Sequence, residues 1–242
     1  MAASAGRLAG RVILITGASR GLGAAVAEAC AAEGAHLVLV ARTKGALEEI
    51  DDAVRRHGGE ATLVQLDVTR GDLVDALGGA LYERFKRLDG FVACAAELGT
   101  ITPVSHLEPK VLDQALAVNL VANQRLIRSL DPLLRAADAG RAVFVTDGSV
   151  LPGRAYWGAY ATSKAGLEAL ALSYAAETRI TRLRVNLYDP GPMATRLRAR
   201  AFPGERPDAQ PGPATKVPPL IELLLPGCTR HGEIVRFAQS GA

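Results

Sequence analysis

The feature of this sequence that most constrains its fold is a regular alternation between short apolar runs and longer helical segments. The runs are continuously apolar, which is typical of parallel strands buried on both faces. Strands are expected at Val12–Thr16, His36–Val40, Ala61–Leu66, Gly90–Cys94, Arg141–Thr146, Arg182–Leu187 and Glu233–Phe237. Helices are expected at Leu22–Glu33, Lys44–His57, Asp72–Arg87, Pro109–Ala136 and Tyr156–Arg179. Repeated strand–helix–strand units predict a parallel sheet, and right-handed crossovers place helices on both of its faces.

This pattern predicts a Rossmann-type α/β fold, a doubly wound parallel sheet, with residues 1–242 forming a single domain. The rhythm breaks only at about residues 190–219, where eight of the 13 prolines occur. Such a segment cannot be one continuous helix. Long loops inside compact domains are often lids over a pocket, so we expect a lid here, with a plain surface connection as the alternative.

Composition excludes several classes of function. The net charge of +3 comes from scattered residues, which argues against a nucleic-acid-binding face. The three cysteines, Cys30, Cys94 and Cys228, are widely spaced and show neither a disulfide framework nor a metal-binding pattern. Met1–Arg11 has no signal-peptide core, and no apolar stretch approaches the length of about 18 residues that a membrane span needs. We therefore expect a cytoplasmic protein with no metal and no membrane partner.

A glycine-rich turn leaves the first expected strand and opens the first expected helix. Its glycines let the backbone turn sharply and approach a pyrophosphate, and the helix N-terminus supplies unpaired N–H groups. The position between a strand and a helix is the context that such a motif requires. The residues expected to bind a dinucleotide here are Gly17, Ser19, Arg20, Gly21, Leu22 and Gly23.

The end of the second strand indicates which dinucleotide is bound. An acidic residue at this point would bind the ribose 2′-hydroxyl of NAD, but none is present, and Arg42 follows instead. Arg20, from the glycine turn, is expected to reach the same corner. Because two guanidinium groups suit a 2′-phosphate, the sequence predicts NADP(H) rather than NAD(H).

The chemistry is predicted from Tyr160 and Lys164 in the helix after the fifth strand. Their i, i+4 spacing places them on one helical face. A neighbouring ammonium stabilises a phenolate, so we expect Lys164 to lower the pKa of Tyr160 and make it a general acid/base.

Together these motifs resemble the short-chain dehydrogenase/reductase family, most closely its bacterial 3-oxoacyl-carrier-protein-reductase-like members, over about residues 10–200. The glycine turn matches the family's T-G-x-x-x-G-x-G. The resemblance implies that Tyr160 donates a proton to a substrate carbonyl and that Lys164 also holds the nicotinamide ribose. It implies that Asn119 supports a proton relay, although its position alone favours a buried hydrogen-bonded residue over a catalytic one.

The resemblance also implies further cofactor contacts and an assembly. Asp67 and Val68 correspond to a pair that contacts adenine, although Asp67 by itself is also a typical helix-start residue. Pro190, Gly191 and Thr195 correspond to the motif at the nicotinamide end. The helices expected at Pro109–Ala136 and Tyr156–Arg179 correspond to the family's dimer seam, which implies a homodimer or homotetramer.

Two departures from the family stand at the substrate end. Its N-N-A-G motif is replaced by Ala93–Ala96, and the position of the substrate-orienting serine, thirteen residues before Tyr160, holds Asp147. An ionised carboxylate only accepts hydrogen bonds, and it repels a developing oxyanion. Either Ser149 or Thr146 replaces the serine, or Asp147 is kept protonated by its surroundings.

Two functions remain open at this stage. The first is an NADP(H)-dependent oxidoreductase that interconverts a carbonyl and an alcohol of a small-molecule substrate, with Tyr160 as general acid/base. The second is a catalytically impaired NADP-binding sensor or assembly module. Tyr160, Lys164 and Asn119 favour the enzyme, whereas Asp147 favours the module.

Overall fold

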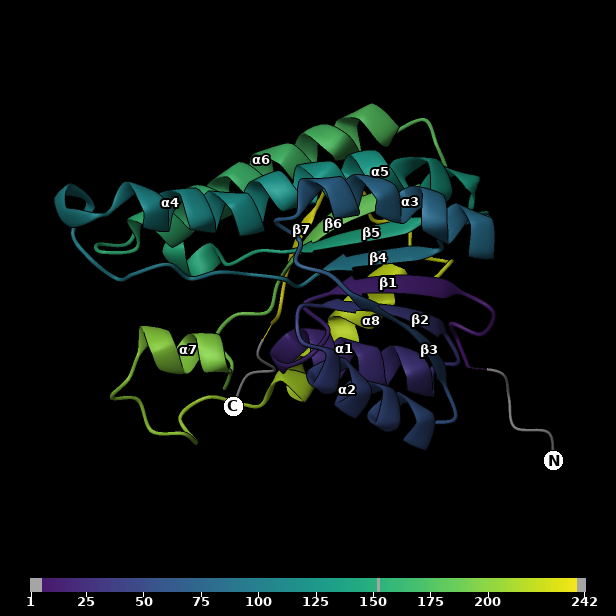
Figure 1. Ribbon diagram of the computed structural model, residues 1–242, viewed down its shortest axis with the longest axis horizontal. Helices are drawn as coiled ribbons and strands as arrows, with labels where there is room; N and C mark the ends of the chain where they lie inside the picture. Colours follow the sequence, from purple (N-terminus) through teal and green to yellow (C-terminus); the bar gives the residue numbers. More distant parts are fainter. Residues whose placement is uncertain (1–5, 152, 239–242) are drawn as a thin grey trace.

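The computed structural model describes residues 6–151 and 153–238, and in this part of the chain seven strands form one parallel sheet (Figure 1). Their order is β3-β2-β1-β4-β5-β6-β7. The strands are β1 Val12–Thr16, β2 His36–Ala41, β3 Glu60–Gln65, β4 Gly90–Ala93, β5 Arg141–Val145, β6 Arg184–Asp189 and β7 Ile234–Arg236. Chain order reverses beside β1, which is the point where open α/β sheets bind ligands.

Helices cover both faces of the sheet, as Figure 1 shows. One face carries α1 Gly21–Ala32, α2 Lys44–Arg56 and α8 Pro218–Leu224. The other carries α3 Gly71–Phe85, α4 Pro109–Leu116, α5 Ala122–Ala136 and α6 Gly158–Thr178. The short helix α7 Arg196–Ala201 projects to one side of the sheet (Figure 1).

The two faces explain why the strands are continuously apolar. Along β1, Leu14 packs into the cluster beneath α3, α5 and α6, while Ile13 and Ile15 pack into the cluster beneath α1 and α8. Along β2, Val38 packs into the first of these clusters and Leu37 into the second. Successive side chains of a strand point to opposite faces, so both sets of side chains along β1 and β2 meet an apolar layer.

The structure confirms the predicted α/β fold, and the strand and helix limits differ from the expected ones by one or two residues at most ends. The predicted helix Pro109–Ala136 is interrupted by a π-helical segment, Ala117–Val121, between α4 and α5. The helix expected from Tyr156 begins only at Gly158, because Tyr156 has φ 73°, which no helical residue adopts.

The sequence predicted that the proline-rich stretch 190–219 does not form one continuous helix, and the structure agrees. It contains α7 and a 3₁₀ turn at Pro213–Lys216, and α8 begins within it at Pro218. Both helices were missed by the sequence analysis. In α8 the prolines occupy the first helical turn, where the missing N–H groups would have no intrahelical partner, so the helix tolerates them.

Candidate functional site

A cavity of about 810 Å³ lies across the carboxyl ends of β1, β4, β5 and β6. All but one of the predicted site residues line it, and the exception is Asn119. The residues that it brings together are Gly17, Ser19, Arg20, Gly21, Leu22, Gly23, Arg42, Asp67, Val68, Asp147, Ser149, Tyr160, Lys164, Pro190, Gly191 and Thr195. The volume is within the range of about 300–1,000 Å³ that is typical of ligand pockets.

The glycine turn is held by close backbone packing. Gly17 has φ 65°, and a Cβ placed on it would lie 2.8 Å from the backbone nitrogen of Ala95. A Cβ on Gly23 would lie 2.3 Å from the carbonyl oxygen of Gly17. No side chain of the described residues caps the N-terminus of α1. Uncapped N–H groups beside a backbone that no side chain shields fit the phosphates of a dinucleotide.

Arg20, Arg42 and Asp67 all line the cavity, and Arg42 is near enough to Asp67 for its charge to act on that carboxylate. The Asp67 carboxylate accepts hydrogen bonds from the Thr69 backbone N–H at 2.9 Å and from its hydroxyl at 2.8 Å. Burial raises the pKa of Asp67, but these bonds and the charges of Arg42 and Arg70 outweigh it and lower that pKa overall. Asp67 therefore stays ionised near Arg42 and Arg70 while it shapes the turn that leads into α3.

Tyr160 and Lys164 lie on one face of α6, and they are 5 % and 2 % exposed. The Lys164 Nζ donates to the carbonyl oxygen of Val145 at 2.7 Å and lies 5.7 Å from the centre of the Tyr160 ring. Burial lowers the pKa of Lys164 to about 8, against the opposing charges of Asp147, Cys94 and Glu168.

The pKa of Tyr160 shifts in the direction opposite to the one expected from the sequence. Burial raises it, and the negative charges of Asp147 and Asp189 raise it further. The i, i+4 spacing predicted the neighbouring ammonium, but it carried no information about the two carboxylates whose charges act on the phenol. In the free protein Tyr160 is therefore a protonated phenol.

Asn119 lies in the π-helical segment and is completely buried behind the cavity wall. Its side chain accepts from the Glu97 N–H and donates to the Glu97 carbonyl oxygen, both at 2.8 Å, and it donates to Ser163 Oγ at 2.7 Å. The backbone carbonyl oxygen of Asn119 accepts from Asn123 Nδ2 at 2.8 Å. These bonds tie the segment after β4 to α6, and they match the structural alternative that the sequence left open for Asn119.

Asp147 and Ser149 form a local pair at the cavity surface. Asp147 Oδ1 accepts from the Ser149 backbone N–H at 3.0 Å and from the Ser149 hydroxyl at 2.6 Å. Thr146 donates its hydroxyl to Glu168 Oε1 at 2.6 Å. A hydroxyl has one proton to donate, so in this arrangement neither Thr146 nor Ser149 has a free donor for a substrate oxygen.

A sequence profile described as short chain dehydrogenase matches residues 11–206. The chain belongs to the short-chain dehydrogenase family. It is 34 % identical over 234 residues to the uncharacterised oxidoreductase YciK of Escherichia coli K12, covering 96 % of this chain and 92 % of YciK.

Solved structures of this family agree with the fold. A short-chain dehydrogenase from Salmonella enterica serovar Typhi superposes with a TM-score of 0.92 and 32 % identity, covering 98 % of this chain and 99 % of that one. A chain from Escherichia coli CFT073, solved in complex with NADPH, superposes with a TM-score of 0.90 and 32 % identity, covering 97 % and 99 %. The closer resemblance to 3-oxoacyl-carrier-protein reductases stays a prediction.

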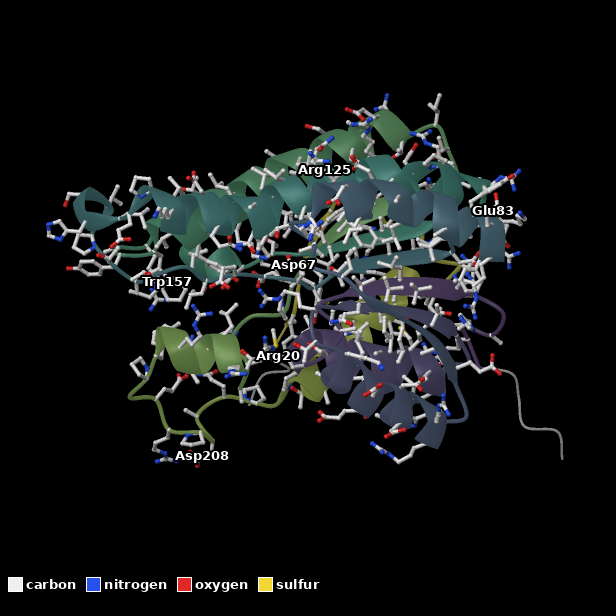
Figure 2. The ribbon with its side chains drawn as sticks, viewed as in Figure 1. Arg20, Asp67, Glu83, Arg125, Trp157 and Asp208 are labelled. Atoms are coloured by element: carbon white, nitrogen blue, oxygen red, sulfur yellow. The ribbon has the colours of Figure 1, made fainter. Side chains whose placement is uncertain are left out.

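At the far end of the cavity of this short-chain dehydrogenase lie side chains to which the sequence analysis assigned no individual role. Trp157 and Phe202 stack at 5.7 Å between ring centres, and Arg154 lies over both rings. Arg200 of α7 pairs with Glu97 at 3.0 Å. Figure 2 shows Trp157 on the side of α7, away from Arg20 and Asp67. A segment with no periodicity gave no signal for these contacts, because they join residues distant in the chain.

Two further features of the described ranges concern metal and membrane binding. No group of three or more histidine, cysteine, aspartate or glutamate side chains there is arranged to hold a metal ion. No helix within 6–151 and 153–238 has both the length and the apolar character to cross a membrane.

Proposed function

We propose that this short-chain dehydrogenase is an NADP(H)-dependent oxidoreductase that interconverts a carbonyl and an alcohol of a small molecule. The observation that supports it best is the pair formed by Tyr160 and Lys164. Both are buried on one helical face, and both reach the cavity whose opposite wall is the glycine turn. A general acid beside a dinucleotide cradle is the arrangement that hydride transfer to a carbonyl needs.

NADP(H) fits the residues that line the cavity. The glycine turn and the uncapped N-terminus of α1 would hold the pyrophosphate, and Arg20 and Arg42 would hold the 2′-phosphate. Asp67 and Val68 would contact the adenine, and Pro190, Gly191 and Thr195 the nicotinamide end. When bound, NADPH supplies the hydride. The NADPH complex of the Escherichia coli CFT073 chain supports this choice of cofactor.

In the reductive direction, Tyr160 donates its hydroxyl proton to the carbonyl oxygen of the substrate. The raised pKa of Tyr160 keeps this proton in place in the free protein, so the residue enters the reductive reaction as a protonated phenol. Lys164 donates one N–H to the Val145 carbonyl oxygen, so two N–H groups of its ammonium remain for the ribose and the phenol oxygen. Asn119 fixes the backbone of Glu97 at the cavity wall and so keeps the substrate end in shape.

A second candidate is an NADP-binding sensor or assembly module with impaired catalysis. The pair formed by Asp147 and Ser149 supports it, because the hydroxyl proton of Ser149 is already donated to Asp147. A proton added to this pair would free one donor for the substrate oxygen. The same pair therefore fits a working site if it is protonated, and an impaired one if it is ionised.

Three further features belong to the proposal. The segment at about residues 190–219 acts as a lid, since α7 and Phe202 close the substrate end of the cavity. The chain works in the cytoplasm, and it forms a homodimer or homotetramer through α4, α5 and α6. A monomer at micromolar concentration in light scattering would contradict the assembly.

The experiment that tests the function follows NADPH oxidation with ketones, quinones and 3-oxoacyl thioesters. We expect turnover with at least one class, and a loss of about 10²–10⁴-fold in kcat for Tyr160→Phe, since the proton donor is removed. NADPH affinity should be unchanged in that variant. NADPH binding without turnover of any substrate would support the module and contradict the enzyme.

A further inference from the structure

Asp189, the last residue of β6, connects two loops that border the cavity. Its side chain is largely buried, with 8 % of the residue exposed. One carboxylate oxygen, Oδ1, accepts from the Gly191 N–H at 3.0 Å, and the other, Oδ2, accepts from the Gly148 N–H at 3.1 Å. The residue thus has one hydrogen bond in each loop.

These two loops carry different parts of the proposed reaction. Gly148 stands between Asp147 and Ser149, at the start of the 3₁₀ turn Gly148–Val150. Gly191 belongs to the segment proposed to contact the nicotinamide end. Backbone pairing between β5 and β6, the strands that lead into these loops, ends with the Thr146 N–H donating to the Tyr188 carbonyl oxygen at 2.9 Å. Among the described residues, no backbone hydrogen bond joins the loops beyond that point, so the Asp189 carboxylate is the next connection.

Gly148 is shaped to this carboxylate. A Cβ placed on Gly148 would lie 2.6 Å from Asp189 Oδ2, closer than real Cβ contacts allow. The φ angle of Gly148 is not among the positive ones, so its backbone would accept alanine. The glycine is therefore required by the neighbouring carboxylate rather than by its own conformation.

The charge of Asp189 has a partner outside the cavity. Arg236 of β7 approaches Oδ2 with its Nε at 3.9 Å, and its own side chain is 68 % exposed. The Phe237 N–H also donates to the Asp189 carbonyl oxygen at 2.8 Å. Both contacts hold the end of β6 in place, so the carboxylate has a fixed base from which to hold the two loops.

We propose that Asp189 and Gly148 form a clamp that sets the position of the Asp147–Ser149 loop relative to the nicotinamide loop. Asp189 acts here as a positioning residue, through the backbone of both loops, and Gly148→Ala tests this role while leaving in place the Asp189 charge that acts on Tyr160. The inference rests on the proposed function for the reaction that the clamp serves. A displacement of about 1 Å at reacting groups is enough to lower a rate by about 10²-fold, so the clamp should act mainly on kcat.

The test is a double-mutant cycle with Gly148→Ala, Asp189→Ala and the double variant. We expect Gly148→Ala to lower kcat about 10–100-fold in the original background, because its Cβ displaces the carboxylate. In the Asp189→Ala background the same change should cost less than about 3-fold, since the obstacle is gone. Asp189→Ala alone should lower kcat about 10-fold and leave the NADPH dissociation constant within about 3-fold.

Two controls make the cycle specific. Gly79→Ala, in α3 and outside the site, adds a Cβ with nothing within 4 Å and should behave as the original chain. Asp189→Asn offers one carboxamide oxygen where the carboxylate offers two, so it can accept from one loop only, and its kcat should lie between those of the original chain and Asp189→Ala.

The melting temperature of the free protein reports the same contact without turnover. Gly148→Ala should lower it in the original background and not in the Asp189→Ala background. Equal effects of Gly148→Ala in both backgrounds would overturn the clamp. The effect of Gly148→Ala on the melting temperature could depend on Asp189 while Asp189→Ala leaves kcat unchanged in an active enzyme. That result would overturn the positioning role. If no substrate is turned over, the proposed function fails, and the melting cycle still decides the clamp.

Discussion

The cofactor end and the substrate end of the cavity are built by different means. At the cofactor end, Gly17 and Gly23 pack so closely against neighbouring backbone that neither has room for a side chain. The helix α1 begins there with an uncapped N-terminus. At the substrate end, polar side chains satisfy one another, as Ser149 does with Asp147 and Thr146 with Glu168. Recognition by backbone depends on a few residues adjacent in the chain, whereas recognition by side chains depends on partners that the fold brings together.

The largest expected effect tests the cofactor end. Gly23→Ala would place a Cβ 2.3 Å from the Gly17 carbonyl oxygen, so the turn must open. We expect NADPH affinity, measured by fluorescence titration, to fall at least about 100-fold, the equivalent of roughly 2.8 kcal/mol.

The matched control is Gly45→Ala in α2, where an added Cβ meets nothing within 4 Å. Alanine is the better helix former, so this variant should bind NADPH normally and melt no lower than the original chain. If Gly23→Ala fails to fold, Gly21→Ala provides a second probe, since its Cβ meets only the Thr195 side chain, at 3.5 Å, and its φ of 57° strains an alanine within the same turn. Unchanged affinity in both variants would mean that the backbone does not hold the phosphates.

An intermediate effect concerns the choice between the two dinucleotides. We expect the original chain to bind NADP(H) at least about tenfold more tightly than NAD(H), because charge-assisted hydrogen bonds contribute roughly 1.5–3 kcal/mol each. The double variant Arg20→Ala, Arg42→Ala should bind both with similar affinity. Equal affinities in the original chain, measured by the same titration, would remove the role assigned to the two arginines.

The smallest expected effect sharpens the contrast at the substrate end. Replacing Asp147 by serine removes the acceptor that takes the Ser149 proton and supplies a neutral donor. One oxyanion donor is worth about 10²–10³ in rate, so we expect Asp147→Ser to raise kcat at least about tenfold near neutral pH. Asp147→Asn, which also donates, should move in the same direction, and adding Tyr160→Phe should abolish the gain.

The pH profile of the original chain gives an independent measure of the same residue. If Asp147 is ionised and faces the substrate oxygen, kcat should rise as pH falls, because protonation converts an acceptor into a donor. A profile that is flat from pH 5 to 8 would reject the repulsion. An unchanged or lower kcat for Asp147→Ser would show that Asp147 is a working donor, or that Ser149 has taken its place.

The sequence alone determined the fold and the cofactor end of the site. Continuous apolar strands such as Val12–Thr16 predict a sheet covered on both faces. In the structure the side chains of this strand pack into the core clusters on both faces of the sheet. The predicted residues of the glycine turn all line the cavity, because a motif of adjacent residues carries its own geometry. The spacing of Tyr160 and Lys164 likewise required only the periodicity of a helix.

The tertiary structure alone decided what surrounds those residues. The pKa of Tyr160 moves upward rather than downward because burial and two carboxylates from other elements act on it, and no local pattern records them. Asn119 is enclosed by Glu97 and Ser163, 22 and 44 positions away in the chain. The need for a glycine at position 148 arises from Asp189, 41 residues later. Desolvation, charge and packing depend on distances through space, so they exist only once the chain has folded.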